Sequence, residues 1–120
     1  TINGHGGTIS RSNQETTPNF RLFEVAAIGT LHLNDVIIGY GGFVDEGGNL
    51  KNTGNTYIQG ATIRSGRATD GAGIFNEGNL SISHSSLLYN SGGCGGGIWN
   101  DSTGFLTITN SLVLGNTADT

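Results

Sequence analysis

Acidic side chains that recur at similar places along the chain are the first candidates for chemistry. Three stretches share one pattern of small residues, two large apolar residues, a short polar residue and an acid. The acids of this pattern are Asp45 with Glu46, then Glu77, then Asp101. Aligned carboxylates could supply the two acids of glycoside hydrolysis or weak ligands for Ca²⁺. We expect the simpler alternative, solvated turn acids that recur only because the pattern recurs.

The other reactive side chains occur singly. Gly4-His5-Gly6 is similar to a short element of polygalacturonases, but the paired Asp and the Arg/Lys group of that element are missing, so we expect a turn. His32 and His84 lack metal-ligand spacing and have no Cys cluster beside them. Cys94 lies in a glycine-rich stretch expected to be a turn, without a neighbouring base to activate it. It is a candidate for an intermolecular disulfide or a buried free thiol. We therefore expect no catalytic residue, no metal and no cofactor.

Aromatic side chains could stack on sugar rings. Phe23, Phe75 and Trp99 each follow an aliphatic residue in the recurring pattern. Large aromatic residues beside aliphatic ones are typical of a core. We expect at least part of this set to be core, with a sugar platform as the alternative.

The elements that position these residues are revealed by a repeat of about 24 residues. Leu80-Ser-Ile82-Ser and Leu106-Thr-Ile108-Thr alternate apolar and polar residues, which predicts strands with the apolar residues inside. The equivalent apolar positions are separated by 31, 25, 24 and 26 residues. These positions are Ile2, Leu33, Ile58, Ile82 and Ile108.

Short strands at this period predict an all-β fold, a parallel β-helix of four to five coils that stack about 4.8 Å apart. We expect one solenoid domain over residues 1–120, with coils that bury their apolar faces only by stacking. The recurring apolar pair aligns Phe23, Val44, Phe75 and Trp99 across coils. The expected core ladder is Leu22, Phe23, Val44, Ile58, Ile63, Ile74, Phe75, Leu80, Ile82, Ile98, Trp99, Leu106 and Ile108.

Turns and loops account for most of the remaining residues. Asn recurs at equivalent strand ends, for example at Asn76 and Asn100, where stacked side chains can bond to each other and to turn backbone. Three polar segments are expected to be loops: residues 12–18, 46–56 and 64–70.

Composition agrees with a turn-rich repeat. Of 120 residues, 59 are Gly, Asn, Ser or Thr. The 22 Gly rule out a helical bundle, because Gly destabilises helices. The single Pro and the irregular Gly spacing exclude collagen. The net charge is −4 and the basic residues are scattered, which disfavours nucleic acid and anionic membranes as partners. No apolar run is long enough to span a bilayer.

The repeat also resembles a known family. Gly96-Gly97-Ile98-Trp99-Asn100, followed by residues 106–116, has the pattern of bacterial right-handed parallel β-helix proteins with polymorphic-outer-membrane-protein-like repeats. Residues 71–76, followed by 80–90, show it again. The resemblance implies an extracellular or cell-surface bacterial protein, adhesive or structural, without fixed catalytic residues. Right-handed winding follows from the resemblance and from the usual hand of parallel crossovers.

Both ends of the chain fall inside the repeat, and we expect neither to carry a cap. We expect either a fragment of a longer solenoid or ends covered by the next subunit, with Ile2, Ile9, Leu112 and Leu114 at the contact. The first functional hypothesis is a non-enzymatic filament or matrix subunit that stacks head to tail on copies of itself. The alternatives are a repeat region of a surface adhesin that binds glycan or host surface, and a polysaccharide-degrading β-helix enzyme.

Overall fold

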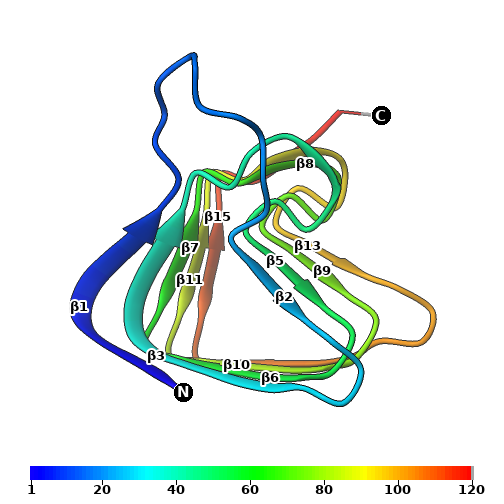
Figure 1. Cartoon of the computed structure of the whole chain (residues 1–120). Coiled ribbons are helices and arrows are strands. Elements are labelled where there is room, and N and C mark those ends of the chain that lie inside the picture. The colour runs from blue at the N-terminus through cyan, green and yellow to red at the C-terminus, as the bar shows by residue number, and fades with distance from the viewer. Residues whose placement is uncertain (120) are drawn as a thin grey trace.

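The computed structural model describes residues 1–119, which form sixteen strands joined by turns and contain no helix. Every strand pairing in this range is parallel, and strands pair with their counterparts in neighbouring coils. Figure 1 looks along the stack, so that successive coils overlie one another. The predicted all-β parallel solenoid is therefore confirmed. No helix in the described range could cross a membrane.

The strands lie on four faces of the coil (Figure 1), each named here by one of its members. The β6 face contains β6 (Asn55–Gln59), β10 (Asn79–Ser83), β14 (Phe105–Thr109) and the first halves of β1 (Ile2–Ser10) and β3 (Thr30–Gly39). The β7 face contains the second halves of β1 and β3 with β7 (Thr62–Arg64), β11 (Ser86–Leu88) and β15 (Leu112–Leu114). The β8 face contains β4 (Val44–Glu46), β8 (Arg67–Asp70), β12 (Ser91–Cys94) and β16 (Thr117–Ala118). The β9 face contains β2 (Phe23–Val25), β5 (Leu50–Asn52), β9 (Ile74–Asn76) and β13 (Ile98–Asn100).

The strand register confirms the alignment of the alternating motif. Ile2, Leu33, Ile58, Ile82 and Ile108 are direct partners from coil to coil. Leu33, Ile58 and Ile82 are completely or almost completely buried, because they lie between other coils. The residues of the predicted ladder that belong to the central apolar cluster are Ile58, Ile63, Ile74, Leu80 and Ile82. Those half-buried against it are Leu22, Phe23, Ile98 and Leu106.

Single residues in the left-handed backbone conformation turn the chain at three corners. Asp35, Gly60, His84 and Asn110 stand at the corner between the β6 and β7 faces, with φ between 47° and 62°. The next corner is turned by Tyr40, Ser65, Tyr89 and Gly115, and the third by Gly47, Gly71 and Gly95. At Gly71, a Cβ would also lie 2.4 Å from the Ile74 carbonyl oxygen, so only glycine fits there.

Asn side chains link consecutive coils, as the sequence predicted, and Asn52, Asn76 and Asn90 among them are completely buried. Asn52 Nδ2 donates to Asn76 Oδ1 at 2.8 Å, and Asn76 Nδ2 donates to Asn100 Oδ1 at 2.7 Å. A second series joins Asn90 to Asn116, with Nδ2 to Oδ1 at 2.8 Å. These bonds give the turns a coil-to-coil connection in addition to the strand pairing.

The prediction that Val44 aligns with Phe75 was wrong. Val44 pairs with Ala68 on the β8 face, whereas the partner of Phe75 in the preceding coil is Lys51. The aligned strand is Leu50–Asn52. The recurring pattern does not reveal it, because it carries a lysine where later coils carry an aromatic residue.

Two predicted loops were wrong for a related reason. Residues 46–56 contain β5 and the start of β6, and residues 64–70 contain β8. Their outward side chains are polar, and strands of only three or four residues leave little alternation to detect. Residues 12–18 do form a loop, which leaves the outline of the coils between β1 and β2 (Figure 1).

Candidate functional site

The predicted ladder of acids does not form as expected. Glu46 ends β4 and pairs in register with Asp70 on the β8 face. Its carboxylate forms an ion pair with Lys51. Glu77 and Asp101 alone remain aligned, directly after β9 and β13, where their backbone N–H groups donate to Asn52 and Asn76 respectively. The corresponding place in the coil before Glu77 is occupied by Thr53, so the series holds two acids rather than three.

The singly occurring residues lie apart from these acids. His5 is in the bulged part of β1, His84 turns a corner, and His32 lies on the outer side of β3. Cys94 is a free, half-buried thiol at the end of β12, and thus in a strand rather than the expected turn. Its register partner is Asp70. Residues 1–119 hold no group of three or more His, Cys, Asp or Glu side chains that could bind a metal ion.

The three aromatic residues of the recurring pattern have different surroundings. Phe23 stands in the inward column that continues through Leu50, Ile74 and Ile98. Phe75 follows inward Ile74 and therefore points outward, yet it is only 4% exposed. Lys51 Nζ lies 5.6 Å from the centroid of its ring. Trp99, the register partner of Phe75 on β13, also points outward and is half-buried. Neither Phe23 nor Phe75 offers an open ring face for a sugar.

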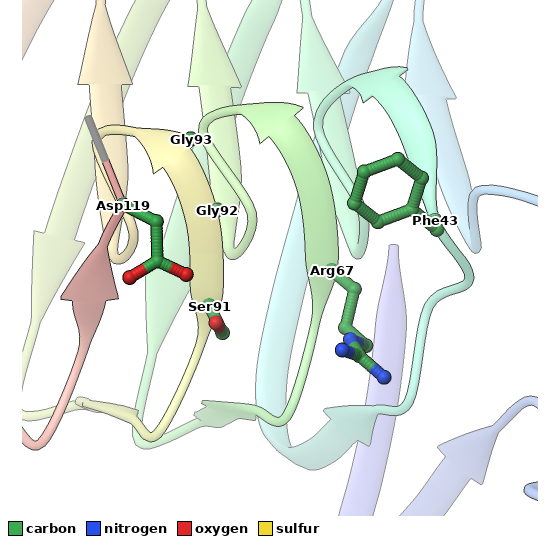
Figure 2. A pocket seen from close by; sticks show the side chains of 6 residues that line it. All are labelled: Phe43, Arg67, Ser91, Gly92, Gly93 and Asp119. Carbon is green, nitrogen blue, oxygen red and sulfur yellow. The ribbon is translucent and has the colours of Figure 1, made fainter.

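A hollow of about 210 Å³ lies on the β8 face (Figure 2). Two glycines of β12, Gly92 and Gly93, form part of its lining. Figure 2 shows Arg67 and Asp119 toward opposite ends, with Ser91 between them and Phe43 beyond Arg67. A cation and a carboxylate at the two ends favour neither an anionic nor a cationic ligand along the whole hollow.

A second hollow, of about 160 Å³, crosses the strands of the β6 face. Its lining residues are Tyr57, Asn79, Leu80, Ser81, Phe105 and Thr107, none of which is charged. We call it the β6 groove. Tyr57 is 45% exposed and Phe105 is 74% exposed. These two aromatic residues were not among the site residues predicted from the sequence. The sequence feature that could have revealed them is their outward position in strands whose residues alternate strictly between the inner and the outer side.

The two ends of the stack expose apolar side chains from the inner columns. On the last coil, Ile108 is 39% exposed and Val113 is 54% exposed, although their partners Ile82 and Leu87 are completely buried. On the first coil, Ile9 is the partner of buried Ile38. Ile2, which is half-buried, belongs to the same column as Ile108.

The register refines the residues expected at the ends. Ile2 and Ile9 stand in inner columns. Leu112 and Leu114 flank Val113 in β15, so strand alternation places them on the outer side of the coil. Val113, which was not predicted from the sequence, occupies the inner position as the partner of Leu87.

Strand edges are also open at both ends. In the described range, β14, β15 and β16 end their sheets at the last coil and β13 ends its sheet at the coil before it, whereas β1 and β2 are the edges at the first coil. Each such edge presents backbone N–H and C=O groups in the geometry of a parallel ladder. The ends therefore combine apolar columns with unfilled hydrogen-bonding positions.

Comparison with known proteins gives no relative: no protein-family model, no curated protein and no solved structure matches the chain.

Proposed function

We propose that this protein is a structural subunit that stacks head to tail, through its first and last coils, into a filament. The observation that carries the proposal is that the inner columns reach both ends and match there. The column that ends in Ile108 begins with Ile2, and the column that ends in Val113 begins with Ile9. The two ends are thus complementary to each other, which favours a second copy of this chain as the occupant.

The matching strands define the expected contact. β14 and β15 of one copy would pair with the first and second halves of β1 of the next. Each exposed apolar side chain that becomes fully buried contributes about 1.5–3 kcal/mol at most. The contact joins two different surfaces by a translation along the stack, so it does not close and generates a fibre.

The setting of this filament is part of the proposal. An extracellular or cell-surface location in a bacterium, and right-handed winding of the coils, are supported by the resemblance of the repeat to bacterial surface proteins. The same open edges also favour a second candidate, a repeat region of a larger surface adhesin, in which further coils of one chain cover them. The encoded precursor sequence distinguishes the two, because the second candidate requires more coils next to these.

The decisive experiment blocks one end at a time. Val113→Asp places a carboxylate on the last coil and leaves the first coil intact, whereas Ile9→Asp does the reverse. We expect the unaltered protein to form fibres that electron microscopy detects, and each variant alone to sediment as a monomer. An equimolar mixture of the two variants should form dimers only, because one intact first coil meets one intact last coil.

Matched controls exclude general effects of an added charge. Phe43→Asp alters a side chain of similar exposure, 57%, which precedes β4 on the β8 face and belongs to neither of the two contact columns, and it should leave fibres intact. Circular dichroism of every variant checks the fold. Monomers of the unaltered protein at all concentrations would overturn the proposal, and so would closed dimers that form within one blocked variant.

A further inference from the structure

The β6 groove is distinguished by an aromatic ring with one covered and one open face. The rings of His32 and Tyr57 are stacked, with centroids 4.8 Å apart and an interplanar angle of 15°. The two residues are register partners on β3 and β6, so the stack runs along the solenoid. The next position in this outward column is Ser81, whose small side chain leaves the far face of the Tyr57 ring uncovered.

The polar groups of the groove are arranged around this open face. Ser81 and Thr107 continue the column with hydroxyl groups, and no side-chain hydrogen bond within the described residues engages either one. Asn79 donates its Nδ2 to Asn55 Oδ1 at 2.8 Å, which leaves its own Oδ1 free to accept. Phe105, the register partner of Asn79, stands on the far side of β10 from Tyr57.

We infer that the β6 groove binds an uncharged oligosaccharide, with one pyranose ring on the open face of Tyr57. A pyranose ring has apolar C–H faces and a rim of hydroxyl groups. An open aromatic face beside free hydroxyl and amide groups matches that distribution, because the ring stacks while its rim forms hydrogen bonds. The uncharged lining selects against acidic sugars, for which a cation would be needed.

The spacing of the two aromatic residues favours an extended sugar chain. Tyr57 and Phe105 lie on strands separated by one intervening strand, hence about 10 Å apart along the stack. Tyr57 is opposite Ser81 of β10 and Phe105 is opposite Asn79 of the same strand. The open face of Tyr57 looks along the stack, so a glycan that stacks on it extends along β10, and different sugar units of an extended β-linked chain can contact the two rings. An α-linked glycan coils and would reach only one ring. The β8 hollow offers no comparable match, since its ends carry opposite charges.

All six residues that line the groove belong to one chain, so this binding does not depend on filament formation. Isothermal titration with uncharged β-linked hexasaccharides of glucose, xylose and N-acetylglucosamine tests it, with α-linked maltohexaose for comparison. We expect saturable binding of at least one β-linked hexasaccharide. Tyr57→Ala and Phe105→Ala should each weaken it roughly tenfold, the loss of one stacking contact.

Two further variants separate a sugar site from a merely apolar patch. Ser81→Tyr extends the aromatic stack into the place assigned to the sugar, so it should abolish sugar binding although it adds aromatic surface. Phe43→Ala removes an equally exposed aromatic ring from the β8 face and should change nothing.

Three results would overturn the inference. They are absence of saturable binding to every hexasaccharide at millimolar concentration, binding that Tyr57→Ala leaves unchanged, and Tyr57-dependent binding of a proline-rich peptide without any binding of sugar. Circular dichroism confirms that each variant is folded before it is titrated.

Discussion

Asn76 shows at the scale of one residue how a chain rich in small polar residues forms a stable stack. Its side chain is completely buried and makes hydrogen bonds to both neighbouring coils. Its Nδ2 also lies within bonding distance of the Gly78 and Phe105 carbonyl oxygens in the adjoining turns. A buried amide contributes net stability only when its groups are satisfied. The Asn series is therefore part of the core, although it is polar.

Replacing Asn76 with alanine should therefore destabilise the protein strongly. The change leaves Asn52 Nδ2 and the Phe105 carbonyl oxygen without this partner, and we expect a loss of about 2–4 kcal/mol in the free energy of unfolding. Urea denaturation followed by circular dichroism measures it. Asn55→Ala is the matched control, since Asn55 takes part only in the exposed bond to Asn79, and a change within about 0.5 kcal/mol is expected. Equal losses in both variants would contradict the account.

At the scale of the strand and its corner, the backbone conformation constrains the sequence. Ser65 turns the chain between β7 and β8 with φ of 52°, a conformation that costs a residue with a side chain about 1–2 kcal/mol. The two corners that are not formed by glycine alone are occupied by Asp, His, Asn, Ser, Tyr and Gly. No β-branched residue occurs at these corners in residues 1–119.

Ser65→Val should accordingly lower the free energy of unfolding by about 1–2 kcal/mol, because a β-branched side chain is strained at positive φ. The control is Ser86→Val in β11, a strand position where valine is favoured. That variant should be neutral or slightly stabilising. Thermal and urea unfolding of the pair measure the difference, and an undamaged Ser65→Val protein would refute the corner argument.

The strands also show which parts of the structure were predictable. The β6 face was predicted residue by residue because Leu80, Ile82, Leu106 and Ile108 preserve the alternation in five-residue strands. The β5 strand was missed because Lys51 replaces the aromatic residue by which the motif was recognised. The β6 groove could not be found from one repeat, because it depends on three coils that bring Tyr57, Ser81 and Phe105 together.

At the scale of the whole molecule, stability and assembly are linked. If the end coils bind one another, the folded protein is stabilised by mass action and the unfolding temperature rises with protein concentration. Differential scanning calorimetry over a hundredfold range of concentration measures this rise. Val113→Asp should remove the dependence and unfold at one temperature throughout. A concentration-independent unfolding temperature for the unaltered protein would count against end-to-end association.

The loop of residues 12–18 would recur once per subunit along the proposed filament. The β6 face has five strand levels in one chain, whereas the β8 face has four, because the first coil passes this loop instead of a strand. Stacked copies would therefore show a break in the β8 face at every fifth level, about 24 Å apart. A tag inserted in the loop would appear along the fibre at that interval and on one side of each junction, so micrographs could reveal both the subunit length and the direction of the filament.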